Sequence, residues 1–154
     1  MLSTQAIENI KKAIAKYPRK KSASMDALMI AQKECGHLTE DILLEIAHLL
    51  EMPPVQLNQV AAFYTMYNKR PVGKYHIQVC TNISCSLLGS EHIFQFFSKM
   101  LGIKKGETTS DKKFTLSEVE CLGSCGTAPM MQINDDYYEN LTEAKIEEIL
   151  KTLK

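Results

Sequence analysis

Apolar residues recur at intervals of three and four through residues 1–68, which is the period of an amphipathic helix. Isoleucines over residues 7–14 share one face of a first helix, and Pro18 interrupts the pattern. The same spacing returns over 43–50 and over 57–64. Each helix thus has one apolar stripe, which it must bury against another helix to be stable. The pattern therefore predicts a small helical bundle over residues 1–68.

Capping and breaking residues set the expected ends of these helices. Ser24 is a good N-cap for a second helix, and Gly36 suits the left-handed position that follows the last turn. Thr39 can cap a third helix, which has acidic residues in its first turn. Pro53 and Pro54 end that helix and begin a fourth. Four helices are thus expected before residue 68.

The period changes after a break of turn-forming and charged residues at 68–73. Alternation of apolar and polar residues then marks strands, and helical spacing returns between them. The predicted elements are a strand over 75–79, a helix over 90–101, a strand over 114–119, a hairpin over 130–138 and a last helix capped by Thr142. Strand, helix and strand in this order predict a parallel crossover. The expected fold class is α+β: a helical bundle over 1–68, then an α/β domain with a mixed sheet over 74–154.

Composition and charge exclude several function classes. The 154 residues carry 18 basic and 18 acidic side chains, so the formal net charge of zero gives no support for nucleic-acid binding. The apolar runs are too short to span a membrane, and the N-terminus lacks the features of a signal or transit peptide. Five cysteines without an export signal favour reduced thiols in the cytoplasm over a disulfide framework.

Four of the five cysteines form two close pairs, which is how a fold supplies four thiolates to one metal centre. Cys80 and Cys85 are spaced C-x4-C, and Cys121 and Cys125 are spaced C-x3-C. Neither interval is the C-x2-C that is usual for structural zinc or thiol–disulfide exchange. An interval of four is familiar from plant-type iron–sulfur sites. Cys35 lies far from both pairs and is interpreted as a structural thiol.

The predicted topology brings the two cysteine pairs together. The first pair follows the carboxyl end of the strand over 75–79, and the second follows the strand over 114–119. Carboxyl ends of parallel strands lie at the same edge of a sheet, where open α/β folds bind their ligands. The sequence therefore predicts that all four sulfurs lie at one edge.

These segments resemble a known family. CTNISC and ECLGSCGTAPMMQINDDYYENLT, with the upstream stretch GHLTEDILLEIAHLLEMPPVQLNQVAAFYTMY, are similar to the thioredoxin-like [2Fe-2S] ferredoxin family. Within it they resemble the small iron–sulfur subunits of the NADH dehydrogenase module of respiratory complex I, known in bacteria as the E subunits of NADH–quinone oxidoreductase. The likeness runs from about Leu28 to Leu150.

The resemblance implies a thioredoxin-like domain that holds one [2Fe-2S] cluster on Cys80, Cys85, Cys121 and Cys125. It implies helices that dock on a partner flavoprotein subunit carrying FMN and NADH, and further iron–sulfur subunits in the same complex. The chain would transfer electrons without catalysing a reaction alone. It would lie peripherally on the cytoplasmic side of the inner membrane. A cis bond before Pro129 is a further expectation.

Other functions remain open from the residues alone. The same module serves NAD-linked hydrogenases and formate dehydrogenases. A zinc-stapled interaction module is an alternative of a different class, and thiol–disulfide exchange is a third that the missing C-x-x-C disfavours.

Around the cysteines, Gly123 and Gly126 are expected to let backbone N–H groups approach sulfur, or to satisfy a positive φ. Acidic residues such as Glu120 are expected either to lower the potential or only to form a solvated rim.

Overall fold

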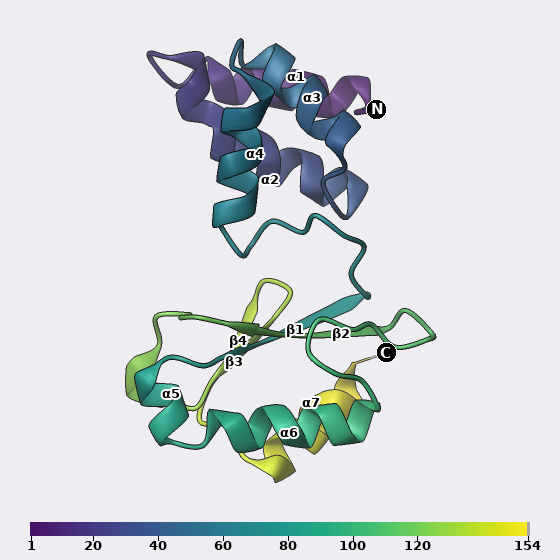
Figure 1. The fold of residues 1–154 in the computed structure, drawn as a ribbon, viewed down its shortest axis with the longest axis vertical. Coiled ribbons are helices and arrows are strands. Elements are labelled where there is room, and N and C mark those ends of the chain that lie inside the picture. The colour runs from purple at the N-terminus through teal and green to yellow at the C-terminus, as the bar shows by residue number, and fades with distance from the viewer. Residues whose placement is uncertain (154) are drawn as a thin grey trace. The chain divides into compact units, whose positions relative to one another are not determined.

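The structure is a computed structural model that describes residues 1–153, and the chain forms two compact units (Figure 1). The first unit is Met1–Pro71, and the second begins at Val72. The boundary lies within the 68–73 segment where the hydrophobic period changes. Each unit has its own cluster of buried apolar residues, so each is described by itself.

The first unit is helical throughout. Its elements are α1 (Thr4–Ile14), the 3-10 helix η1 (Lys20–Ala23), α2 (Ser24–Cys35), α3 (Glu40–Leu49) and α4 (Pro54–Phe63). Its largest fully buried side chains come from all four α-helices and the turns between them: Ile10, Leu28, Leu38, Ile46, Leu50 and Leu57. The stripes predicted from the sequence therefore meet in one core, as a bundle requires.

The caps explain where these helices begin and end. Thr39 caps α3 as predicted, and its Oγ1 accepts a hydrogen bond from the Ile42 backbone N–H at 3.4 Å. Gly36 ends α2 with a φ of +78°. The prediction that Ser24 caps α2 was wrong, because η1 runs directly into that helix and Ser24 is already its first residue. A capping side chain is not needed where a preceding turn continues the helical path.

The second unit contains a mixed four-stranded sheet, as predicted. Its elements are β1 (Tyr75–Cys80), α5 (Ile83–Leu87), α6 (Ser90–Leu101), β2 (Phe114–Val119), η2 (Cys125–Thr127), β3 (Met131–Ile133), β4 (Asp136–Tyr138) and α7 (Glu143–Thr152). The strand order is β2-β1-β3-β4. β1 and β2 are parallel, while β3 pairs antiparallel with both β1 and β4.

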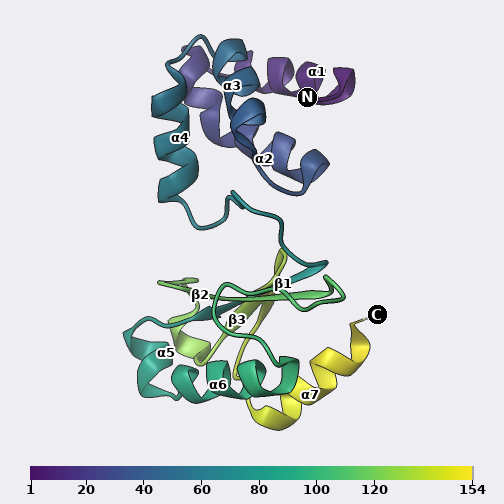
Figure 2. The same cartoon turned by 45° about the vertical axis from the view of Figure 1, so that its right-hand side comes forward.

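Helices α6 and α7 cover one face of this sheet (Figure 2). Phe97 of α6 and Ile146 of α7 are fully buried with Ile77 and Leu116 of the two central strands. Thr142 caps α7 as predicted, accepting a hydrogen bond from the Lys145 backbone N–H. The short helix α5, which carries Cys85, was not predicted, because five residues are too few to show a helical period.

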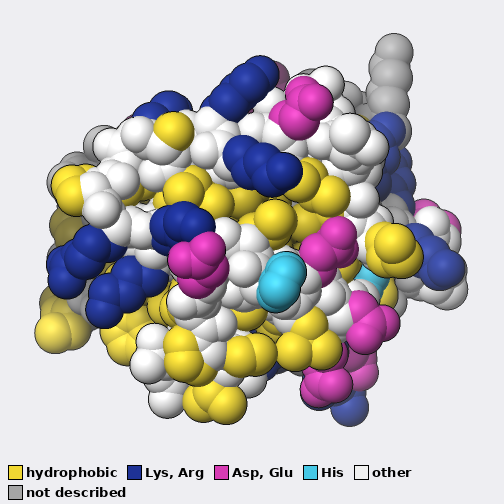
Figure 3. Space-filling view, turned by 90° about the horizontal axis from the view of Figure 1, so that it is seen from above, with side chains coloured by type: hydrophobic (Ala, Val, Ile, Leu, Met, Phe, Trp, Pro, Cys, Tyr) yellow, Lys and Arg dark blue, Asp and Glu magenta, His cyan; other side chains and the backbone are white. Residues whose placement is uncertain are grey.

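Charged side chains of both signs are present on the face shown in Figure 3, with hydrophobic side chains between them. Basic side chains are more frequent at the left of this view, and several acidic ones gather at the lower right. This distribution agrees with a formal net charge of zero. Within residues 1–153, no helix combines the length and the hydropathy that a bilayer crossing demands.

Candidate metal centre

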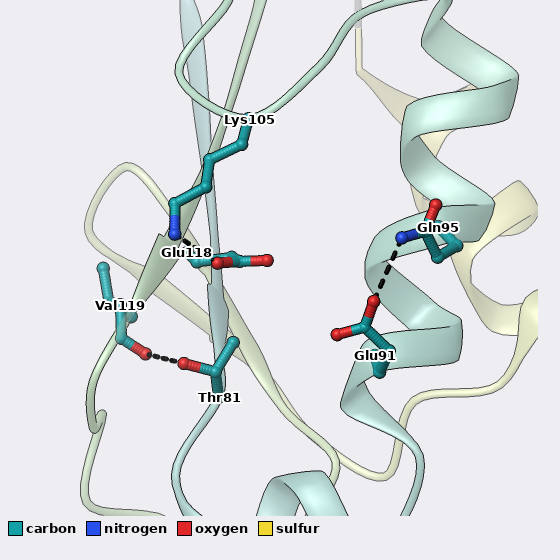
Figure 4. Close-up of polar contacts among 6 residues, drawn as sticks. All are labelled: Thr81, Glu91, Gln95, Lys105, Glu118 and Val119. Carbon is teal, nitrogen blue, oxygen red and sulfur yellow. Dashed lines mark hydrogen bonds and ion pairs between the residues drawn. The ribbon is translucent and has the colours of Figure 1, made fainter.

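The two cysteine loops leave the sheet side by side. β1 and β2 are in parallel register, with Cys80 opposite Val119, so both strands end at the same edge. The residue after Cys80 ties the two ends together: the backbone N–H of Thr81 donates to the carbonyl of Val119 at 2.9 Å, and its Oγ1 donates to the same oxygen at 3.2 Å (Figure 4). The shared edge predicted from the topology is thus present.

Cys80 and Cys85 form the buried half of the site. Cys80 is the last residue of β1 and Cys85 lies in α5, and both are 2% exposed. They pack against Met130, which is fully buried and whose carbonyl accepts the Cys80 backbone N–H at 3.2 Å. Leu122 and Ala128 close this small apolar cluster from the second loop.

Burial controls the protonation of Cys85. Removal from water raises the pKa of the Cys85 thiol to about 11, and the Cys80 side chain adds to the rise, while a backbone hydrogen bond from Met130 acts in the opposite direction. Both Cys80 and Cys125 lie close enough to Cys85 for their negative charge to raise this pKa further. A thiolate in this position needs a cation to compensate it, so metal binding would release the proton.

Cys121 and Cys125 form the exposed half. Cys121 lies two residues beyond the end of β2, and its Sγ accepts a hydrogen bond from the Gly123 backbone N–H at 3.3 Å. Gly123 has a φ of +81°, so both roles considered for this glycine are found together. Gly126 has no positive φ, so the conformational role considered for it is wrong, and no atom lies within 4 Å of the position that a Cβ would take there.

The structure brings three of the four predicted residues into one neighbourhood. Cys80 and Cys85 are in contact, Cys125 interacts electrostatically with Cys85, and Cys121 lies exposed on the loop that carries Cys125. Across residues 1–153, no three His, Cys, Asp or Glu side chains converge closely enough to hold a single metal ion. Four thiols on two adjoining loops are the donor set of a [2Fe-2S] cluster, so the residues present fit that group.

A carboxylate that the sequence did not single out holds the second loop. Glu139 accepts hydrogen bonds from the hydroxyls of Ser124 and Thr127, which lie on either side of Cys125. These bonds, the one from Ser124 first, lower the pKa of the Glu139 carboxyl. Glu139 is 15 and 12 residues from its two partners, so no local sequence pattern could have revealed the contact.

The Ala128–Pro129 peptide bond is cis, as the family resemblance implied. Met130 packs against the cysteines, whereas Met131 belongs to the main core of the second unit. Cys35 is half-buried at the end of α2 in the first unit.

This fold and site define an α/β protein with two cysteine pairs that follow adjacent parallel strands of one sheet. The chain matches the model of the thioredoxin-like [2Fe-2S] ferredoxin family over residues 10–154. The chain therefore belongs to this family.

Relatives of known name refine the comparison. The chain is 48% identical over 147 residues to the second E subunit of NADH-quinone oxidoreductase from Rhizobium meliloti (strain 1021), covering 96% of this chain and 88% of the relative. It is 52% identical over 141 residues to the E subunit of NADH-quinone oxidoreductase from Rickettsia prowazekii (strain Madrid E), covering 90% and 80%.

A solved structure with the same fold is an NAD+-reducing [NiFe]-hydrogenase in the H2-reduced state. The TM-score is 0.71 over 84% of this chain and 22% of the hydrogenase chain, with 21% sequence identity. The likeness supports the fold. At this identity it carries no information about the reaction.

Proposed function

We propose that this chain is the electron-transfer subunit of an NADH dehydrogenase module, as in NADH–quinone oxidoreductase, and holds one [2Fe-2S] cluster on Cys80, Cys85, Cys121 and Cys125. The observation that carries the proposal is the pair of cysteine loops leaving adjacent ends of parallel strands, with Thr81 bonded across to Val119. The proposal is also supported by relatives that are about half identical over most of the chain, because these are E subunits of NADH-quinone oxidoreductase.

The cluster, when bound, would supply one-electron chemistry, and the cysteines would divide its support between them. Cys80 and Cys85 would hold the inner side away from water, because they are buried against Met130. Cys121 and Cys125 are exposed and would face the side from which an electron arrives. The Gly123 N–H would stabilise negative charge on the Cys121 sulfur, which favours the reduced state.

A partner must supply the chemistry of NADH. We infer a flavoprotein subunit that binds FMN and NADH, together with further iron–sulfur subunits, and expect no catalytic activity from this chain alone. Exposed apolar side chains on α4, Val55 at 67% and Phe63 at 78%, suit an interface with such a partner. The complex would place the chain peripherally on the cytoplasmic side of the inner membrane.

Anaerobic reconstitution of the purified chain with iron and sulfide tests the cluster. We expect two irons and two sulfides per chain, a red-brown colour and an electron paramagnetic resonance (EPR) signal on reduction. A colourless protein that binds one zinc would overturn the proposal in favour of the interaction module.

Copurification from native cells tests the partner. A tagged chain should retain a flavoprotein and other components of a quinone-reducing complex. Recovery of hydrogenase or formate dehydrogenase components instead would assign the chain to one of those NAD-linked enzymes.

A further inference from the structure

The turn that presents Cys125 is clamped by a side chain from another part of the chain. Ser124 precedes this cysteine and Thr127 follows two residues after it. Both hydroxyls donate to the same oxygen of Glu139, Oε1, and the Thr127 bond is 2.7 Å long. One carboxylate oxygen therefore fixes both sides of the 3-10 turn that begins at Cys125.

Further bonds close this clamp. The Ser124 and Thr127 hydroxyls are 2.9 Å apart, and the Thr127 backbone N–H donates to the Ser124 carbonyl at 3.3 Å. The backbone N–H of Asn140, next to Glu139, donates to the Thr127 carbonyl at 2.7 Å. Lys145 of α7 donates from Nζ to the Glu139 carbonyl. The turn is thus attached to the start of α7 through both side chain and backbone.

Elsewhere in this loop, Leu122 and Ala128 pack against the buried cysteines, and the Tyr137 hydroxyl donates to the Leu122 carbonyl at 2.9 Å. Cys125 lies between these two points. Its side chain is exposed, as is Gly126, and the loop from Glu120 to Ala128 has no strand pairing. An exposed loop of this kind samples many conformations unless specific bonds restrict it. Hydrogen bonds to an ionised carboxylate are about twice as strong as neutral ones. A glutamate carboxyl is ionised at neutral pH, and the hydroxyl bonds lower the pKa of Glu139 further.

We propose that Glu139 is a positioning residue for the cluster: acting through Ser124 and Thr127, it holds the turn that places the Cys125 sulfur for binding. The inference rests on the proposed function, because it assigns a role within that same site. Glu139 has no bond to any of the four cysteines among the contacts of the described residues, so its effect must pass through the two hydroxyls. Removal of a group that orients a metal ligand commonly lowers metal affinity by about 10- to 100-fold.

The test compares three variants with a matched control. Glu139→Ala removes the clamp, Glu139→Gln keeps an acceptor oxygen without the charge, and Ser124→Ala with Thr127→Val removes the donors. Glu143→Ala is the control, because its Oε1 pairs with His92 Nε2 of α6 at 2.7 Å, away from the cysteine loop. Each reconstituted chain is challenged with an iron chelator while the visible absorption is followed, and its EPR spectrum and melting temperature are recorded.

We expect Glu139→Ala to lose the cluster about tenfold faster than the wild type and to show a shifted EPR spectrum. Glu139→Gln should fall between them, and Glu143→Ala should match the wild type. The variant with Ser124→Ala and Thr127→Val should lose the cluster as fast as Glu139→Ala. Adding Glu139→Ala to that double variant should not speed the loss further, because the same contacts are already absent. The melting temperature separates a general loss of fold from this local effect.

Several results would overturn the role. The role would be contradicted if the cluster of Glu139→Ala lasted as long as that of the wild type, or if Glu143→Ala lost its cluster as fast as Glu139→Ala. It would also be contradicted if the combined variant lost its cluster much faster than either Glu139→Ala or the double hydroxyl variant. A wild-type chain that takes up no cluster would overturn the proposed function and this role with it. A wild-type cluster that is indifferent to Glu139→Ala would overturn this role alone.

Discussion

The backbone N–H of Gly123 donates a hydrogen bond to the Sγ of Cys121 at 3.3 Å, and Gly123 adopts a φ of +81° to do so. A positive φ favours glycine, because other residues place Cβ against the backbone in this region. Nothing lies within 4 Å of the position a Cβ would take at Gly123, so its constraint is conformational rather than one of space.

Gly123→Ala should therefore lower the midpoint potential of the cluster. The substitution strains the backbone by about 1–2 kcal/mol, which weakens the bond that stabilises the reduced state. Gly126→Ala is the matched control, since Gly126 has open space around it and no positive φ. Redox titration followed by EPR should show a shift in Gly123→Ala only, and equal potentials in both variants would contradict the role of this hydrogen bond.

Replacement of each proposed ligand by serine should impair the cluster, whereas Cys35→Ser should not. Cys80 and Cys85 lie on β1 and α5, and Cys121 and Cys125 lie in the segment that follows β2 at the same end of the parallel strands, while Cys35 lies on α2 of the first unit. Loss of a thiolate should shorten cluster lifetime by at least about tenfold. Iron and sulfide analysis with EPR measures the outcome, and complete cluster loss in Cys35→Ser would contradict the assignment.

Glu120→Gln should raise the midpoint potential. Glu120 is exposed one residue before Cys121, and its neighbour Glu118 is already paired with Lys105 (Figure 4). Removal of the exposed negative charge makes addition of an electron easier, and the shift should be at most about 40 mV because water screens an exposed charge. An unchanged potential in redox titration would leave Glu120 as only part of a solvated rim.

The sequence alone predicted the helices and strands whose apolar residues recur with a clear period. The stripes on α1, α3, α4 and α6 each reflect burial of one face, and burial is what periodicity records. The alternation in β1 was enough to identify a strand, although Gln78 between Ile77 and Val79 is also buried. The boundary of α2 at Ser24 was wrong, because a preceding 3-10 turn has no periodic signal of its own. The short α5 was missed for the same reason.

The candidate site was only partly visible in the sequence. Pairing of the cysteines on consecutive predicted strands was enough to place both loops at one edge, because parallel topology fixes where strands end. The clamp from Glu139 to Ser124 and Thr127 could not be predicted, since it joins polar residues of different loops. Such contacts depend on loop conformation, which hydrophobic patterning does not encode.

His76 should make the folded state less stable in mild acid. Burial lowers the pKa of its imidazole, whose Nε2 lies 2.9 Å from the Ser117 Oγ between β1 and β2. Below about pH 6.5 the His76 side chain binds a proton in the unfolded chain but resists protonation in the folded one. The free energy of unfolding is therefore highest above this pH, and it declines as the pH falls from 6.5 toward the lowered pKa of the folded state. Each unit of lowering is worth about 1.4 kcal/mol.

The measurement is urea unfolding at pH 7.5 and 5.5. His76→Gln should lose about 1 kcal/mol less than the wild type over this interval. An identical pH dependence in His76→Gln and the wild type would show that this imidazole does not titrate differently on folding.

Gly73→Ala should destabilise the second unit. The backbone N–H of Gly73 donates to the Thr115 Oγ1 at 2.6 Å, which draws the chain close to the start of β2. A Cβ at this position would lie 2.9 Å from backbone atoms of Lys113 and Phe114, and backbone cannot move aside as a flexible side chain can. The resulting strain should cost about 1–3 kcal/mol. Thermal unfolding should show a midpoint lowered by several degrees, with Gly126→Ala as the unstrained control, and equal midpoints would contradict the close approach of Gly73 to β2.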